Sequence, residues 1–208
     1  MSFELFLKAH NIRGNTHFSN KGAFLPRYIR VYKKLLILKD PVNRITLMVL
    51  FVLMVSARNA AKNGCQTKYT YIPDIDMVPT PGMDLELETF LEKEEKKNCS
   101  KCAYVIPTYE ISHKSKKLPA SKTELLSLIK RKYARQFHQT LYPINQKSSN
   151  LNKWEKMGQA KQMDIAYKVQ QYIFKYEPLY IARGDTPQFD ERFQGFGLTR
   201  NTQVEVEK

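Results

Sequence analysis

Short apolar runs alternate along the chain with longer polar segments, and the runs predict strands. Residues 69–76 are predicted to form the first strand, residues 102–106 the second and residues 176–182 the third. Each run is only a few residues long, and Pro79 and Pro107 follow the first two as stop signals. The runs are therefore typical of buried strands rather than of helices.

The segments between these strands predict helices. Residues 57–64 combine good helix formers with a terminal glycine, and residues 83–97 place apolar side chains among charged ones, as on an exposed helix. Ser121 and Glu124 have the spacing of a capping box, which opens a helix at residues 125–133. Strands that alternate with helices predict an α/β fold.

Two further segments are interpreted from their polar and turn-forming residues. Residues 142–152 are expected to be a loop, because they are polar and show no periodicity. Residues 186–193 start with a Thr-Pro turn and are expected to continue as one turn of helix.

The most apolar run, residues 45–55, interrupts this pattern. It is shorter than the roughly 20 residues that a membrane-spanning helix needs, and it begins too far along the chain for an ordinary signal peptide. Three interpretations stay open: an internal signal-anchor, a buried strand or helix, or a segment foreign to the native domain. The chain therefore divides into a basic segment at 1–40, the apolar stretch at 41–56 and a domain at 57–208.

Composition and charge narrow the class of protein. The 208 residues are 42% hydrophobic, which indicates one globular domain with a core. The formal net charge of +14 favours polyanions: nucleic acid, acidic membrane surfaces or nucleotide phosphates. No zinc-finger spacing or RNA-binding motif accompanies this charge, so a solvated basic face is favoured over nucleic-acid recognition.

Cysteine is sparse, with only Cys65, Cys99 and Cys102. The Cys99 and Cys102 pair has no second pair or histidine cluster beside it, which argues against structural zinc. One disulfide with a free thiol left over is expected if the domain lies in an oxidising compartment.

Asp74 and Asp76 are the candidate chemical site. Alternate residues of a strand share a face, so the two carboxylates are expected to converge at the carboxyl end of the first strand, where open α/β sheets bind ligands. Hard oxygen donors suit Mg²⁺ or Mn²⁺, which take further ligands from water and substrate phosphates. Aspartate pairs are also common in turns that bind no metal, so other segments of the chain are needed to distinguish a metal site from a turn.

Five segments, taken in order, resemble the glycosyltransferase family 49 domain found in β-1,4-glucuronyltransferase and LARGE-type enzymes. They are residues 74–79 (Asp-Ile-Asp-Met-Val-Pro), 103–111 (Ala-Tyr-Val-Ile-Pro-Thr-Tyr-Glu-Ile), 118–125 (Leu-Pro-Ala-Ser-Lys-Thr-Glu-Leu), 176–181 (Tyr-Glu-Pro-Leu-Tyr-Ile) and 189–197 (Phe-Asp-Glu-Arg-Phe-Gln-Gly-Phe-Gly), continued by 201–203. The resemblance extends from about residue 57 to residue 203. One such match can arise by chance, whereas five in the same order indicate a common family.

This resemblance implies a GT-A-like α/β fold, truncated at the C-terminus, in a Golgi membrane enzyme with type II topology and a lumenal catalytic domain. The implied activity is metal-assisted, inverting transfer of glucuronate from UDP-glucuronic acid to a xylose-terminated O-mannosyl glycan of the α-dystroglycan type, with Mn²⁺ as cofactor. The implied partners are the UDP-sugar donor, a glycan acceptor on a glycoprotein and the Golgi membrane, without nucleic acid. A homo-oligomer or a partner glycosyltransferase stays open.

The chain departs from the family pattern in two places. A Pro-Val-Asn-x-Ala-Arg-Asn-x-Ala pattern is split here, because residues 41–43 and 57–61 flank the apolar run. We expect residues 44–56 to be an insertion, such as an intron read through in a gene model; a native transcript that contains the segment in frame would contradict this. The family domain also continues into a His-Lys-Gly segment, whose His resembles a metal ligand, and this chain stops before it.

The resemblance assigns expected roles to residues near the Asp pair. Asp74 and Asp76 are expected to form the metal site, with Asp76 as the more direct ligand. Arg58 and Asn59, on the preceding helix, are expected to contact the nucleotide-sugar. The alternative for these two is a surface arginine and a helix-interior asparagine.

Further roles concern the acceptor and the sugar carboxylate. Asp190 or Glu191 is expected to be the general base that an inverting transfer needs, with Asp190 favoured. A following helix would keep the carboxylate ionised through its dipole, and a simple capping role is the alternative. Glucuronate itself carries a carboxylate, for which Lys122, Arg192 and Arg200 are the candidate cations.

Two other functions stay open. One is a catalytically inactive fragment of the same family, which keeps only donor binding. The other is a basic module that binds polyanions, with a steep salt dependence. Tyr109 and Trp154 have two similar alternatives, stacking on an acceptor sugar or the commoner packing in the core.

Overall fold

The computed structural model describes residues 2–6, 11–13, 55–64, 67–74, 76–95, 99, 101–193 and 198–205, with the backbone alone for the first two ranges. The strands are β1 (Ser2–Phe6), β2 (Asn11–Arg13), β3 (Tyr69–Tyr71), β4 (Met77–Pro79), β5 (Cys102–Val105), β6 (Thr108–Ile111), β7 (Ala134–Gln136), β8 (Ile165–Lys168) and β9 (Tyr180–Arg183). The helices are an α-helix at 55–64, α3 (Met83–Glu95), α4 (Lys122–Lys130), the 3-10 helix η1 (Pro143–Ser149), α5 (Leu151–Lys156) and α6 (Thr199–Glu205).

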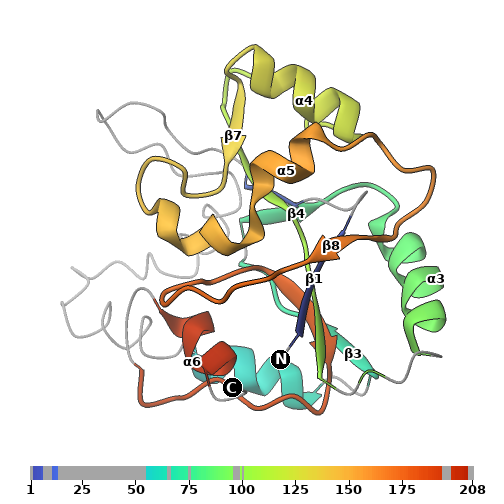
Figure 1. Ribbon diagram of the computed structural model, residues 1–208. Helices are drawn as coiled ribbons and strands as arrows, with labels where there is room; N and C mark the ends of the chain where they lie inside the picture. The colour runs from blue at the N-terminus through green and yellow to red at the C-terminus, as the bar shows by residue number, and fades with distance from the viewer. Residues whose placement is uncertain are drawn as a thin grey trace, which may run out of the picture.

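The strands form two mixed sheets (Figure 1). The larger sheet has the order β3-β9-β5-β1-β8, and the smaller has the order β4-β2-β6-β7. β1 runs parallel to β5 and β2 runs parallel to β6, whereas the other pairs are antiparallel. Only Ile106 and Pro107 separate β5 from β6, so one continuous chain path joins the two sheets.

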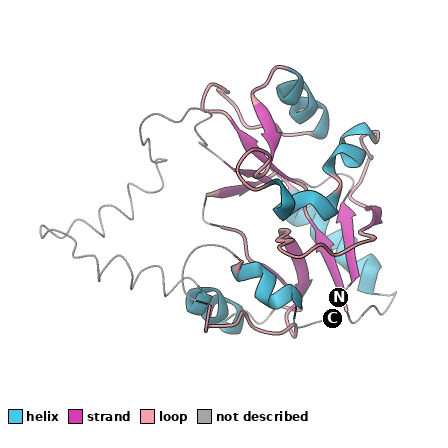
Figure 2. Cartoon of the chain, turned by 60° about the vertical axis from the view of Figure 1, so that its left-hand side comes forward, coloured by secondary structure: helices cyan, strands magenta, loops and turns pink. Residues whose placement is uncertain are grey.

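Both faces of the larger sheet are covered by helices. Successive residues of β5 point to opposite faces: Ala103 and Val105 pack with buried residues of α4 and α5, whereas Tyr104 packs with buried residues of α3. Figure 1 shows α3 on one side of the strands and α4 with α5 on the other, and Figure 2 colours the helices and strands by type. The predicted α/β class is therefore confirmed.

The second strand was predicted to stop at Pro107, and β5 does end just before it, at Val105. The strand that follows, β6, was not predicted. The chain resumes at once as β6, because proline removes only its own N–H donor and here falls where the strand changes partners. On one side of it the Ile106 N–H donates to the Leu179 carbonyl at 2.8 Å, and on the other the Phe137 N–H donates to the Thr108 carbonyl at 3.1 Å.

The first predicted strand is also shorter than the sequence indicates. β3 ends at Tyr71 and β4 begins at Met77, so Asp74 and Asp76 lie in the link between two strands of different sheets. A turn forms the link, closed by the Met77 N–H donating to the Asp74 carbonyl at 2.9 Å. Pro79 is the last residue of β4, which is tolerated because β4 is an edge strand.

The helix predictions are confirmed at 57–64 and at the capping box. The Glu124 N–H donates to the Ser121 hydroxyl at 3.2 Å, and the Glu124 carboxylate accepts the N–H of Ala120 at 2.9 Å. α4 starts earlier than predicted, at Lys122.

Two predicted segments differ in kind. Helix α3 is not simply exposed, since Phe90 and Glu94 are buried. Residues 142–152, predicted as a loop, form η1 and the start of α5, and they hold Trp154 against Tyr109 with 5.7 Å between ring centroids. Both aromatic side chains have no exposed surface, which leaves core packing, not sugar stacking, as their role.

The remaining predictions concern the cysteines and the N-terminal part. Cys99 and Cys102 form a disulfide, as expected for an oxidising compartment. The segment 14–54, which includes most of the apolar run and the proposed insertion, lies outside the described residues. Within the described ranges no helix has the length and apolar character needed to cross a membrane.

Candidate functional site

Asp74 is held by two arginines from distant parts of the chain. Its Oδ1 atom lies 2.5 Å from a terminal nitrogen of Arg58 and 2.5 Å from one of Arg200. Both guanidinium groups are largely buried, with 11% and 9% of their side-chain surface exposed, and the Asp74 side chain is 27% exposed. One carboxylate therefore pairs with two cations at once, which leaves the group with an excess of positive charge, and we call these three residues the Asp74 clasp.

The clasp joins three elements of the fold. Arg58 comes from helix 55–64, Asp74 from the β3–β4 link and Arg200 from α6, and Figures 1 and 2 show the two helices side by side. Arg58 also donates to the Thr199 hydroxyl at 2.8 Å. Burial and the neighbouring Arg200 lower the pKa of Arg58, and Asp74 opposes this effect.

Asn59, the next residue on the same helix, fixes the segment after β9. Its amide exchanges two hydrogen bonds of 2.8 Å with the backbone N–H and carbonyl of Phe189, and it donates to the Glu191 carboxylate at 2.9 Å. Lys62, one turn later, donates to the carbonyl and the hydroxyl of Thr186. Helix 55–64 is therefore the element that positions residues 186–191 beside the clasp.

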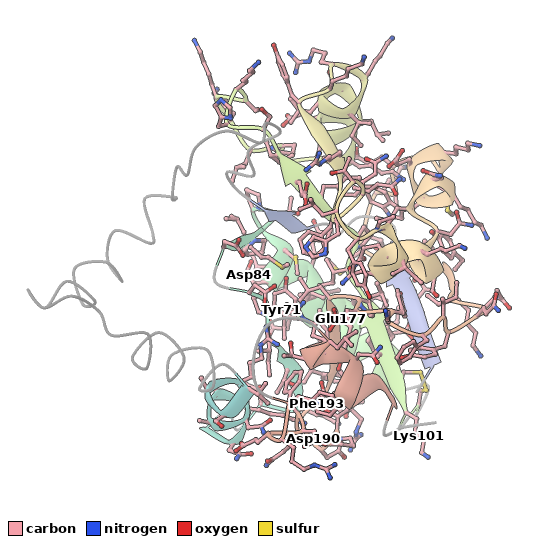
Figure 3. All side chains as sticks on the ribbon, turned by 90° about the vertical axis from the view of Figure 1, so that its left-hand side faces the viewer. Tyr71, Asp84, Lys101, Glu177, Asp190 and Phe193 are labelled. Carbon is pink, nitrogen blue, oxygen red and sulfur yellow. A yellow bond between two sulfur atoms is a disulfide. The ribbon has the colours of Figure 1, made fainter. Side chains whose placement is uncertain are left out.

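Glu177 is a buried acidic residue of the site that the sequence reasoning missed. One carboxylate oxygen accepts the Arg200 N–H at 3.2 Å and the other accepts the Asn145 amide at 3.2 Å. It also lies close enough to Arg58 to oppose the lowering of that residue's pKa. In Figure 3 its label lies toward the middle of the molecule. The signal was present in the sequence, because Glu177 stands inside a segment that matched the family.

Asp190 and Glu191 have different surroundings, although they are adjacent in sequence. Asp190 forms a two-point ion pair with Arg192 at 2.6 and 2.9 Å, and this hydrogen bonding lowers the pKa of Asp190. Glu191 instead accepts from Ser56 at 3.0 Å and from Asn59, both on helix 55–64. The predicted helix is absent from residues 186–193, where the Phe193 N–H donates to the Asp190 carbonyl in a single turn.

Two of the three candidate cations for a sugar carboxylate lie apart from the clasp. Arg192 is 89% exposed and pairs with Asp190. Lys122 is buried in α4, at the opposite end of the molecule from α6 (Figure 1), and donates to the backbone carbonyls of Trp154 and Met157. Burial lowers the pKa of Lys122 to about 8. Arg200 alone of the three is brought to Asp74.

The residues around Asp76 suit a hard cation only in part. Asp76 is half-buried in the turn before β4, beside an Asp74 whose Oδ1 is already engaged by the clasp. Within the described residues no group of three or more His, Cys, Asp or Glu side chains converges as a cation site. One or two carboxylates are enough for Mg²⁺ or Mn²⁺ when substrate phosphates complete the coordination.

A small cavity lies behind the clasp. It has a volume of about 20 Å³ and is lined by β3, β9 and α6 side chains, among them Thr70, Tyr180 and Arg200. This space holds about one water and no sugar ring.

Comparison with known proteins agrees with these features. Residues 54–206 match the family described as "Glycosyl-transferase for dystroglycan". The chain is 33% identical over 147 residues to β-1,4-glucuronyltransferase 1 of Bos taurus, covering 71% of this chain and 34% of that protein. It is 30% identical over 149 residues to the Danio rerio protein of the same name, with the same two shares.

A second kind of relative matches the same region. The xylosyl- and glucuronyltransferase LARGE2 of Mus musculus is 31% identical over 143 residues, which cover 69% of this chain and 20% of that protein. The chain thus spans about a third or less of the length of these relatives. The family expected from the five motifs is confirmed: the chain belongs to the dystroglycan glycosyltransferase family, glycosyltransferase family 49.

Proposed function

We propose that this chain carries the donor site of a GT-A-like glycosyltransferase that transfers glucuronate from UDP-glucuronic acid to a xylose-terminated O-mannosyl glycan on a glycoprotein. The proposal rests on the names of its relatives, which include glucuronyltransferases. The observation that carries it is the Asp74 clasp directly ahead of Asp76. Two buried cations beside a carboxylate-bearing turn suit a diphosphate, whose charge needs both cations and a metal.

Asp76 is proposed to hold the Mn²⁺ or Mg²⁺ ion, while Asp74 holds the arginines. A bound ion would neutralise the charge that develops on the departing diphosphate. This division of roles follows from the contacts of the two residues, since Asp74 shares one oxygen between two guanidinium groups. Asp76 lies two residues further along the chain, at the start of the turn into β4.

The acceptor hydroxyl needs a base as its oxygen attacks the anomeric carbon. In the displacement, the new C–O bond forms on one face while the bond to the UDP oxygen breaks and its electron pair leaves with UDP; the proton goes to a carboxylate. Glu191 is proposed for this role in preference to Asp190. Asp190 has a lowered pKa and is engaged by Arg192, which makes it the weaker base, whereas Glu191 is fixed by Ser56 and Asn59 beside the clasp.

Arg200 is proposed to face the donor, because it is the candidate cation that lies in the clasp. Glu177 helps to position Arg200 by accepting its backbone N–H. The enzyme is proposed to act in the Golgi lumen as part of a type II membrane protein. The Cys99–Cys102 disulfide supports an oxidising compartment.

Transfer of glucuronate to a β-xyloside acceptor, with and without Mn²⁺, tests the proposal. The parent chain, Asp76→Asn, Glu191→Gln and Asp190→Asn should be compared. We expect metal-dependent transfer that Glu191→Gln lowers by at least about a hundredfold, the usual contribution of general-base catalysis, and that Asp190→Asn changes far less. Asp76→Asn should also lower transfer, because it removes the proposed metal ligand. The base assignment is wrong if Asp190→Asn is the more damaging change, and the transferase proposal is wrong if a folded parent chain binds no UDP-sugar.

A further inference from the structure

Six exposed cations gather where the smaller sheet meets α4. They lie on two segments, the loop 112–117 after β6 and residues 130–133, which comprise the last residue of α4 and the loop to β7. We call them the basic cluster: Lys114, Lys116, Lys117, Lys130, Arg131 and Lys132. The two segments are neighbours because Ile111 pairs with Ala134 and the Ser112 N–H donates to the Tyr133 carbonyl at 2.8 Å. Figure 3 shows long side chains with nitrogen tips projecting at this end of the molecule.

The charge of the basic cluster is not neutralised by carboxylates of the described chain. None of its six members takes part in an ion pair with a described residue. The one acidic residue of the segment, Glu124, caps the far end of α4 through the Ala120 N–H. A positive potential of this kind attracts anions over about a Debye length.

The strand register places the basic cluster and Asp76 at the same end of the strands in the smaller sheet. In the smaller sheet Met77 pairs with Arg13, Arg13 pairs with Glu110, and the adjacent Ile111 pairs with Ala134. The start of β4, the end of β6 and the start of β7 therefore lie at the same end of the sheet. Three strand intervals of about 4.8 Å separate β4 from β7, or about 14 Å along the sheet.

Lys132 shows that the cluster is not only a helix end. It has φ of 60°, the left-handed conformation in which glycine is favoured. The Lys132 N–H donates to Ile129 and the Tyr133 N–H to Leu128, which is the hydrogen-bond pattern of a Schellman motif. The dipole of α4 accounts for cations at its last turn, but at this position glycine would relieve the backbone strain that lysine introduces.

We propose that the basic cluster binds an anionic saccharide chain, and specifically the carboxylates of the acceptor glycan beside the transfer site. This inference rests on the proposed function: each transferred glucuronate leaves one carboxylate on the acceptor, so an acceptor that already carries glucuronate can reach the cluster from the same end of the sheet. Nucleic acid fits less well, since the one Phe, Tyr or Trp side chain of these two segments, Tyr133, is half-buried and already lies under the Arg131 guanidinium, 5.6 Å from the ring centroid.

Binding of a fluorescent hyaluronan oligosaccharide, which alternates glucuronate with a neutral amino sugar, tests this directly on the full chain. The variant Lys116→Ser/Lys117→Ser removes two cluster charges, and Lys101→Ser/Lys168→Ser removes two exposed charges from the larger sheet as a matched control. We expect the first to weaken binding by about tenfold at low salt and the second to leave it unchanged. Added salt should weaken binding to the parent.

The variant Lys132→Gly separates binding from folding. The proposal expects weaker hyaluronan binding together with an equal or higher Tm, because glycine keeps the Schellman motif and removes only the charge. Unchanged hyaluronan binding with a higher Tm would overturn it, as would equal binding of a neutral maltooligosaccharide. Tighter binding of single-stranded DNA or of phosphatidylserine vesicles than of hyaluronan would also overturn it.

The proposed transferase activity is checked separately with the β-xyloside, which carries no carboxylate. The cluster variants should leave kcat/KM for this acceptor unchanged. If the parent chain transfers glucuronate to the xyloside but does not bind hyaluronan, the proposal for the basic cluster alone is wrong. If the parent binds hyaluronan but binds no UDP-sugar donor, the transferase proposal is wrong.

Discussion

Replacing Asp74 by asparagine isolates what the clasp contributes to stability. The substitution keeps the shape of the side chain but removes the negative charge that two guanidinium groups, 11% and 9% exposed, share. Removing one partner of a buried ion pair costs about 3–5 kcal/mol. Because Asp74 is itself 27% exposed and asparagine still accepts one hydrogen bond, we expect the lower end, about 3 kcal/mol, or a fall in Tm of about 6–12 °C.

Urea unfolding measures this cost, with Asp164→Asn as the matched control. Asp164 forms a half-exposed ion pair with Lys93 at 3.4 Å, so its loss should cost less than about 1 kcal/mol. Arg58→Met should cost less than Asp74→Asn, because Asp74 then keeps Arg200. In the double variant, relief of the Arg58–Arg200 repulsion should make the loss smaller than the sum by about 1 kcal/mol. An Asp74→Asn cost within about 0.5 kcal/mol of the Asp164→Asn cost would refute the clasp.

Three further substitutions probe the core and the caps. Trp154→Ala should cost about 3–5 kcal/mol in urea unfolding, because the side chain is fully buried against Tyr109; a loss below about 1 kcal/mol would contradict this packing. Ser121→Ala should cost about 1 kcal/mol through the lost capping bond, and an unchanged Tm would show that the cap is idle. Burial lowers the pKa of Lys122 to about 8 from 10.5, so between these pH values the unfolded chain binds more protons and stability should rise with pH. Unfolding of the parent and Lys122→Met at pH 7.5 and pH 9.5 checks the sign, since parallel pH profiles would contradict it.

The sequence was sufficient where a residue's role is set by its neighbours along the chain. The capping box at Ser121 and the buried run of β5 depend on hydrogen bonds and burial within a few residues, and both are confirmed. The order of motifs was also sufficient for the family, because it needs no knowledge of contacts. The stop at Pro107 is confirmed, but β6 was missed, because a proline ends one ladder without preventing the next residues from pairing in another sheet.

The clasp could not be read from the sequence, because its members are brought together only by the fold. Arg58 and Arg200 are 142 positions apart in the sequence numbering and meet at Asp74 through the packing of helix 55–64 on α6. The same long-range packing separates Asp190 from Glu191, giving one to Arg192 and the other to helix 55–64. Lys122 shows the reverse case, since a matched motif placed it near the site while the structure buries it under Trp154.

Calorimetric titration with UDP-glucuronic acid tests directly whether the chain has a metal-dependent donor site at Asp76. The titration should be run with and without Mn²⁺ on the parent chain, on Asp76→Asn and on Asp84→Asn, an exposed carboxylate of α3 labelled in Figure 3. We expect metal-dependent binding that Asp76→Asn weakens by at least about tenfold, a loss of about 1.4 kcal/mol, while Asp84→Asn binds like the parent. If the folded chain binds UDP-glucuronic acid without a metal, and Asp76→Asn binds it equally well, the proposed metal-dependent donor site is wrong.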